Sequence, residues 1–202
     1  MLCIEKKSKC VSVRHRNRKK VYRCGWIDYK GEKIEIMNSY EYGIYYEILY
    51  SFINQFDLLI NRHARVMVVF LQLHVNYYSD DNKHISNLFK NIKQFLKRKY
   101  GMNDIGYQWV REQEKSKKQH YHAVLILDGN LIQYPSKILN IIKEMWLPRG
   151  HFYRLENCFY YLDNKQKEIR KEVVYRASYL AKIRGKGYRP AQTKDYNSSR
   201  LK

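Results

Sequence analysis

Residues 65–75, with the sequence Arg-Val-Met-Val-Val-Phe-Leu-Gln-Leu-His-Val, form an almost unbroken apolar run. The run is too apolar for a strand at the edge of a sheet, and it is short enough to be a single buried strand. A buried strand needs neighbouring strands on both sides to satisfy its backbone hydrogen bonds. We therefore expect a sheet with residues 65–75 at its centre.

Apolar periodicity divides the chain after this run into alternating elements. Residues 85–96 and 138–145 have the spacing of amphipathic helices, whereas residues 105–113, 120–128 and 150–155 have the composition of strands. The order strand, helix, strand, strand, helix, strand is that of the split βαβ arrangement, as in ferredoxin-like and RNA-recognition folds. The predicted fold class is α+β, with an antiparallel sheet, helices on one face of it and further flanking helices.

The sequence divides into a basic arm, a central domain and a basic tail. Residues 1–36 are rich in Lys and Arg with little periodicity, and residues 186–202 mix basic residues with glycine and proline. Residues 37–185 hold the α+β domain, with a preceding helix predicted over 39–62 and a last helix over 165–183. The arm and the tail are expected to contact phosphates, and the tail to be flexible. The densest basic run consists of Arg14, Arg16, Arg18, Lys19 and Lys20.

The charge balance indicates a polyanionic partner. The sequence has 39 Lys and Arg against 19 Asp and Glu, a net charge of +20, which is far more than solubility requires. Nucleic acid is the expected partner, and an anionic membrane surface is the alternative. Because there is no long apolar segment and no signal-peptide pattern, we expect a soluble intracellular protein, without a membrane partner. The 20 tyrosines either stack on bases or reflect codon usage in an AT-rich genome.

Two histidines one residue apart begin the third predicted strand. The side chains of a strand alternate between its faces, so His120 and His122 point to the same side and can share one metal ion. In a chain with seven histidines such a pair also arises by chance. The evidence for this candidate metal site must therefore come from the motifs around it.

In their order and spacing, three segments of the chain form a recognisable set of motifs. They are residues 68–73 (Val-Val-Phe-Leu-Gln-Leu), residues 109–113 (Trp-Val-Arg-Glu-Gln) with the His-Tyr-His of residues 120–122, and residues 175–182 (Tyr-Arg-Ala-Ser-Tyr-Leu-Ala-Lys). Together they resemble the HUH endonucleases, and within that superfamily the YagK/YfjJ family of inovirus and prophage replication proteins. The resemblance spans residues 60–185. The residue between the histidines is Tyr, where the superfamily usually has a bulky hydrophobic residue. It implies a rolling-circle replication initiator that nicks and transfers DNA strands through a covalent 5′-phosphotyrosine.

The resemblance also implies a metal site. His120 and His122 would bind a divalent cation, most simply Mg²⁺ or Mn²⁺, with Zn²⁺ as the alternative. The third ligand in such proteins is usually an acidic or polar side chain of the neighbouring strand, and hairpin pairing brings Glu112 and Glu114 near the histidines. We prefer Glu112, since Glu114 is expected to fall in the turn. The competing interpretation of either carboxylate is a solvated charge on a hairpin.

The motif Tyr-x-x-x-Tyr-x-x-Lys would supply the nucleophile. Tyr179 precedes Lys182 by three residues and is the expected primary nucleophile, while Tyr175 is either a second nucleophile or a residue that packs or stacks on a base. On a continuous helix these three side chains share one face. Lys182 would stabilise the charge of the phenolate or the phosphate, or is a solvated lysine that the helix dipole favours. Arg176, on the same helix, is expected to contact DNA.

The partners implied by the resemblance are single-stranded or origin DNA, a host helicase and a polymerase. A separate helicase is required because the chain has no G-x-x-x-x-G-K-[ST] motif for ATP. The alternatives are a relaxase or transposase with the same motifs, and a non-catalytic regulator or RNA-binding module on the same fold. Relaxases usually carry their tyrosine near the N-terminus and add a third histidine, so the late position of Tyr179 favours the replication initiator.

Overall fold

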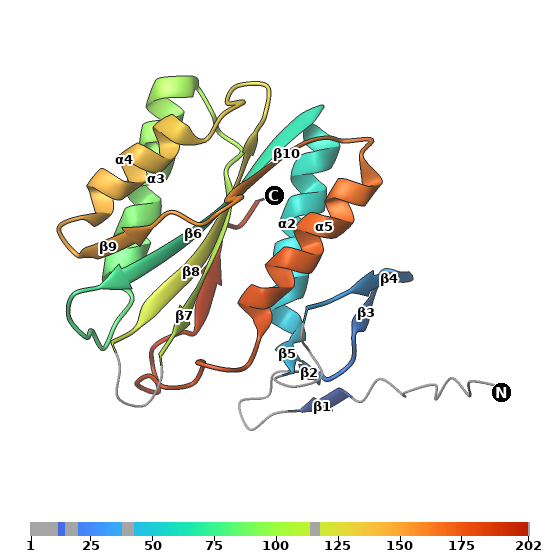
Figure 1. Cartoon of the computed structure of the whole chain (residues 1–202), viewed down its shortest axis with the longest axis horizontal. Helices are drawn as coiled ribbons and strands as arrows, with labels where there is room; N and C mark the ends of the chain where they lie inside the picture. The colour runs from blue at the N-terminus through green and yellow to red at the C-terminus, as the bar shows by residue number, and fades with distance from the viewer. Residues whose placement is uncertain (1–11, 15–19, 38–42, 114–117, 202) are drawn as a thin grey trace.

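The computed structural model describes residues 12–14, 20–37, 43–113 and 118–201, and Figure 1 shows their arrangement. In this part of the chain four α-helices accompany antiparallel sheets. The α+β class and the antiparallel pairing predicted from the sequence are thus confirmed. No helix within the described residues is both long and apolar enough to cross a membrane.

The largest sheet is six-stranded and antiparallel. Its strands are β6 (Arg65–Val75), β7 (Gly106–Glu112), β8 (His120–Asp128), β9 (Gly150–Tyr153), β10 (Phe159–Asp163) and β11 (Tyr196–Ser198). β6 lies inside the sheet, with β8 on one side and both β9 and β10 on the other. β7 pairs with β8, and β11 pairs with the outer side of β7. The apolar run of β6 therefore occupies the central position that its composition predicts, while β10 and β11 were not anticipated.

Helices cover both faces of this sheet rather than one (Figure 1). The helices α3 (Lys83–Tyr100) and α4 (Ser136–Trp146) lie on one face, and α2 (Tyr46–Arg62) and α5 (Lys167–Ser178) lie on the other. The two helices of the predicted strand–helix order, α3 and α4, do lie on one face, and the flanking helices α2 and α5 cover the other. The physical reason is visible in β6, whose successive side chains are apolar on both sides and need a covering layer on each.

The helices follow the apolar spacing of the sequence closely. In α3 the buried side chains recur every three or four residues, and in α4 they form a similar stripe after Pro135. α2 begins at Tyr46, later than the predicted residue 39, and ends as predicted at Arg62. The buried side chains of α3 are Ile85, Leu88, Phe89, Ile92 and Leu96.

Part of the predicted basic arm is folded. β1 (Ser12–Arg14), β2 (Lys20–Tyr22) and β5 (Ile44–Tyr45) form a small sheet, and β3 (Trp26–Tyr29) pairs with β4 (Glu32–Glu35). Alternate side chains of this hairpin are buried in the core under α2 and α5. The two turn residues between its strands both have positive φ, as tight two-residue hairpin turns require. The alternation of apolar and polar residues in β3 and β4 is too short to be recognised in the sequence of a lysine-rich stretch.

The C-terminal segment is also part of the fold. α5 ends at Ser178, and a 3₁₀ helix η1 (Tyr179–Ala181) follows, so the helix predicted over 165–183 is shorter and tighter at its end. The segment predicted to be a flexible tail instead runs along the sheet and supplies β11. This pairing satisfies the outer edge of β7, which would otherwise be exposed. The tail prediction therefore differs from the structure.

Candidate metal centre

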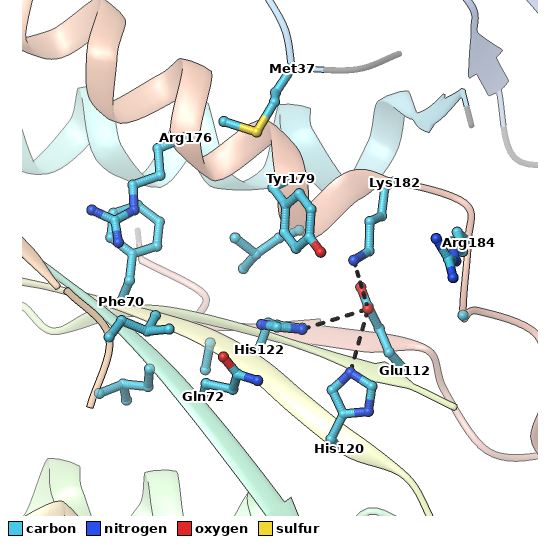
Figure 2. Close-up of a pocket in the computed structure, with 15 residues that line it drawn as sticks. Met37, Phe70, Gln72, Glu112, His120, His122, Arg176, Tyr179, Lys182 and Arg184 are labelled. Atoms are coloured by element: carbon cyan, nitrogen blue, oxygen red, sulfur yellow. Dashed lines mark ion pairs between the residues drawn. The ribbon is translucent and has the colours of Figure 1, made fainter. Parts of the chain in front are cut away.

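Two imidazoles and one carboxylate meet at one end of the sheet. β8 presents His120 and His122 on the side that faces α5 and η1, and the register of β7 places Glu112 directly opposite His120. One carboxylate oxygen of Glu112, Oε2, lies 3.7 Å from His120 Nε2 and 3.6 Å from His122 Nε2. One donor atom from each of the three residues lies within 4.8 Å of the other two. Figure 2 shows this convergence. Glu114, the other carboxylate considered, lies outside the described residues.

Two lysines from the C-terminal segment also contact Glu112. Lys182 Nζ lies 3.2 Å from Oε2, and Lys186 Nζ lies 2.9 Å from Oε1. The side chain of Lys186 has no exposed surface, and it also donates to the backbone oxygen of Lys182. Gly185, which lies between these two lysines in the sequence, passes close to the Glu112 side chain. Its φ of 79° also lies in the left-handed region that glycine adopts without strain. Lys186 was missed from the sequence because it falls in the predicted tail.

The surroundings set the protonation states that a cation site needs. Burial by itself raises the pKa of Glu112, but the hydrogen bond from His120 and the charges of the nearby lysines and His122 bring it well below the ordinary value. Burial lowers the pKa of His122 to about 4, and the neighbouring His120 and lysines act in the same direction while Glu112 opposes them. Near neutral pH the site therefore offers an ionised carboxylate and a neutral imidazole, which are the forms that bind metals.

The donor set fits a divalent cation. Two imidazoles and one carboxylate from adjacent strands leave coordination positions open toward the pocket, as catalytic metal sites require. The convergence of these three side chains matches the ligand set that the sequence predicted.

Tyr179 lies across the pocket from these ligands. Its ring is 5.7 Å from the His122 ring in an edge-to-face arrangement, and Lys182 Nζ lies 3.5 Å from the centre of the Tyr179 ring. The phenol is 39% exposed and its hydroxyl points into a pocket of about 590 Å³ that the three candidate ligands also line. A phenol, a lysine and the three candidate metal ligands thus share one solvent-accessible cavity.

The end of α5 determines this placement. Ser178 Oγ donates to the backbone oxygen of Tyr175 and accepts from the backbone N–H of Met37, and the chain then tightens into η1. Lys182 leaves the helix with an extended ψ of 143°. Lys182 is therefore not on a continuation of α5, although its ammonium still reaches Tyr179.

Tyr175 does not line the pocket of Tyr179. It lies on α5 and lines a neighbouring hollow together with Lys33, Tyr160 and Lys171. The predicted row of Tyr175, Tyr179 and Lys182 on one helical face is not formed, because Tyr179 lies beyond the last residue of α5, in the tighter 3₁₀ turn.

Among the predicted DNA contacts, Arg176 lines the pocket. Its guanidinium lies over the rings of Phe70 and Tyr160 and donates to the backbone oxygens of Glu156 and Asn157. In the N-terminal run, Lys20 is exposed at the start of β2 and Arg14 belongs to β1. The remaining three basic residues, Arg16, Arg18 and Lys19, lie outside the described residues.

His120 is supported from the neighbouring strand β6. The ring of His74 stacks on that of His120 with centroids 5.1 Å apart and an interplanar angle of 17°. Gln72 also lines the pocket, and its side-chain nitrogen Nε2 lies 2.9 Å from His74 Nε2. Burial, followed by the neighbouring His120 and His151, lowers the pKa of His74. Gln72 was not singled out from the sequence, although its position two residues before His74 in a strand indicates a shared face.

A family model for the YagK/YfjJ C-terminal domain matches residues 29–198. The chain belongs to this family. The match includes every residue of the metal centre, Tyr179 and both lysines, and it ends at the last residue of β11. In this YagK/YfjJ domain the C-terminal strand is therefore part of the matched unit. Searches of curated proteins and of solved structures find no significant match.

Proposed function

We propose that the chain is an HUH-type endonuclease and strand transferase that initiates rolling-circle DNA replication. The observation that carries the proposal is the single pocket that holds the phenol of Tyr179 together with Glu112, His120 and His122. Phosphodiester cleavage through a tyrosine needs a nucleophile and a concentration of positive charge in the same cavity.

The reaction would exchange one phosphodiester for another. The Tyr179 oxygen forms a bond to phosphorus while the bond from phosphorus to the 3′ oxygen breaks. The phenol gives up its proton and the departing 3′ oxygen takes one up, which leaves a 5′-phosphotyrosine and a free 3′ hydroxyl. Lys182, 3.5 Å from the centre of the Tyr179 ring, would stabilise the negative charge that develops on the attacking oxygen and on the phosphate during the reaction.

The cation would be Mg²⁺ or Mn²⁺, held by His120, His122 and Glu112. Once bound, it would supply positive charge at the non-bridging phosphate oxygens. The chain's own contribution is to hold the three donors on a rigid sheet and to keep Glu112 ionised through its contacts with Lys182 and Lys186.

The arrangement of the sheet supports the proposal. In chain order the elements run β6, α3, β7, β8, α4, β9, and in the sheet the strands lie in the order β9, β6, β8, β7. Both orders are those expected of a split βαβ core, which is the core of HUH endonucleases. Tyr179 follows the histidine pair in the chain, which favours a replication initiator over a relaxase.

The proposed substrate is single-stranded DNA at a replication origin, with a host helicase and polymerase as partners in the cytoplasm of a bacterial cell. The net charge of +20 favours such a polyanion. Arg176 at the rim of the pocket is placed to contact the strand that enters it.

One observation favours a second candidate, a non-catalytic nucleic-acid-binding protein. Both oxygens of Glu112 already have lysine partners. A carboxylate neutralised in this way is satisfied without a cation.

Covalent capture of DNA distinguishes the two candidates. The full chain is incubated with Mn²⁺ and a labelled library of randomised single-stranded oligonucleotides, and protein-linked DNA is detected on a denaturing gel. We expect an adduct that Tyr179→Phe abolishes and that the matched variant Tyr175→Phe retains. DNA binding by the wild-type protein without any adduct would support the non-catalytic candidate. An adduct that persists in Tyr179→Phe would refute the assigned nucleophile.

A further inference from the structure

The outer surface of α3 is basic along its whole length. The helix contains no acidic residue, and its six basic side chains are exposed. Lys90, Lys93 and Lys97 are three and four residues apart and so lie on one face of the helix. The other basic residues of α3 are Lys83, Arg98 and Lys99.

These three lysines line a hollow of about 450 Å³ between α3 and the segment that leads into β7. The polar side chains around them are neutral, among them Gln94 and Asn103, and no acidic residue lines the hollow. None of the three lysines forms an ion pair within the described part of the chain. By contrast, Lys83 at the start of the helix pairs with Asp81. Like charges at this spacing repel one another, so an anionic ligand would relieve the repulsion.

The hollow lies on the opposite side of the sheet from the candidate metal centre. α3 packs on the face of β6 that carries Met67, Val69 and Leu71, whereas His120 and His122 face α5 and η1 (Figure 1). A nucleic-acid strand in the pocket of Tyr179 therefore does not occupy the lysine hollow. A ligand there is a separate contact.

The chemistry of the surface favours the backbone of duplex DNA. From Lys90 to Lys97 the helix rises by about 10 Å, the length of roughly three base pairs. Sites for single strands combine positive charge with aromatic rings that stack on bases. No residue of α3 is among the exposed large apolar side chains, whereas Tyr175 and Tyr179 on the other side of the sheet are exposed. Tyr107 lines the hollow, but its ring is partly buried and stacked on Phe89. A row of exposed cations on a helix without exposed rings suits phosphate contacts.

We infer that the hollow formed by Lys90, Lys93 and Lys97 binds the phosphate backbone of a DNA duplex, on the side of the sheet opposite the metal centre. This second contact goes beyond the proposed nuclease activity and does not require it. It would hold double-stranded DNA while the opposite side of the domain handles a single strand.

Duplex binding in the absence of metal tests this inference. The affinity of the full chain for a short labelled blunt DNA duplex is measured in EDTA by fluorescence anisotropy over a range of salt concentrations. The triple substitution Lys90→Gln, Lys93→Gln and Lys97→Gln should weaken binding by at least about tenfold and lower the salt slope by about 2 to 3, one unit or slightly less for each lost phosphate contact. Glutamine retains helix propensity, and circular dichroism checks the fold.

A matched triple variant removes the same charge elsewhere. Lys137, Lys143 and Lys165 are exposed lysines outside the hollow, and their substitution by glutamine should change the slope by less than about one unit. Equal losses in the two triple variants would show that only net charge matters and would overturn the inference, as would unchanged duplex binding in the first variant. Adduct formation on single-stranded DNA reports separately on the metal centre, so failure of one proposal is distinguishable from failure of the other.

Discussion

The two faces of the central sheet are built from alternate residues of the same strands, yet they bury different chemistry. On the side of α3 and α4 the sheet is mostly apolar, with Trp109, Tyr121 and Trp146 in successive edge-to-face contacts. The buried Arg111 is a charged residue on this face, and its guanidinium donates to the backbone oxygens of Ser79 and Asp81. On the side of α2 and α5 it is apolar only under the helices, at residues such as Val68 and Ile126. Beyond the end of α5 it carries titratable groups.

The difference follows from where the covering helices end. α5 stops at Ser178, so the end of β8 that begins with His120 is covered by η1 and the segment after it rather than by a full helix. Polar side chains there remain accessible to ligands, whereas the opposite face is closed by continuous packing. Both faces bury an apolar core, and the candidate chemistry lies on the face that its helices cover incompletely.

The largest effect is expected on adduct formation, when two adjacent residues of β8 that point to opposite faces of the sheet are substituted in turn. His122→Ala removes a candidate ligand, so adduct formation should fall by about a thousandfold or more while DNA affinity changes little, because the basic surface is elsewhere. Tyr121→Phe is the control, since the Tyr121 hydroxyl contacts Asn82 on the other face. It should leave adduct formation unchanged. Parallel loss of DNA binding in a folded His122→Ala protein would contradict the metal assignment.

A substitution in the core under α3 should have the converse effect, a loss of stability without a loss of metal affinity. Phe89 is 1% exposed and stacks on Tyr107, so Phe89→Ala should lower the free energy of unfolding by about 3–5 kcal/mol. Urea denaturation measures this loss. Titration calorimetry with Mn²⁺ under native conditions should give an unchanged affinity for the folded protein. A large loss of metal affinity would show that the two faces are not independent.

The strands and helices were predictable where periodicity was long and regular. The apolar run of β6, the stripes of α3 and α4 and the hairpin of β7 and β8 are local patterns, and hairpin pairing was enough to place Glu112 beside the histidines. Features that depend on distant contacts were not predictable. The layer formed by α2 and α5, the pairing of β11 with β7 and the breakdown of the Tyr175–Lys182 row each depend on tertiary packing that no local pattern records.

Lys186 illustrates the same limit within the site. A lysine in a Gly- and Arg-rich stretch suggests a solvated side chain, and a fully buried lysine is uncommon. Its burial depends on Glu112, which is far away in the sequence and accepts its hydrogen bond. The only local signal is its position four residues after Lys182, which acquires meaning once Glu112 is known to lie between the two.

An intermediate effect is expected on the pH dependence of stability. Because the pKa of His122 is lowered to about 4 in the folded protein, against an ordinary value of 6.5, the unfolded chain binds more protons between these two pH values. Without metal, this residue's contribution to the free energy of unfolding is complete above pH 6.5 and is lost as the pH falls toward 4, by up to about 3 kcal/mol. The measurement is urea denaturation in EDTA at several pH values. His122→Gln should flatten this dependence, and an unchanged profile would mean that the imidazole is not buried in its neutral form.

The smallest expected effect separates the two lysines on Glu112. Lys182 contacts the Oε2 atom of Glu112, which also lies near both imidazoles and is the oxygen that a cation would bind. Lys186 contacts the other oxygen, Oε1. Lys182→Met should therefore raise Mn²⁺ affinity by roughly fivefold, about the value of a partly screened ion pair, even though adduct formation falls. Lys186→Met should give no such gain, because it removes a hydrogen bond that orients the carboxylate. Calorimetry on both variants measures the contrast. If Lys182→Met bound Mn²⁺ no more tightly than the wild type, the lysine and the cation would not compete for Oε2, and the binding position would have to lie on the far side of the imidazoles.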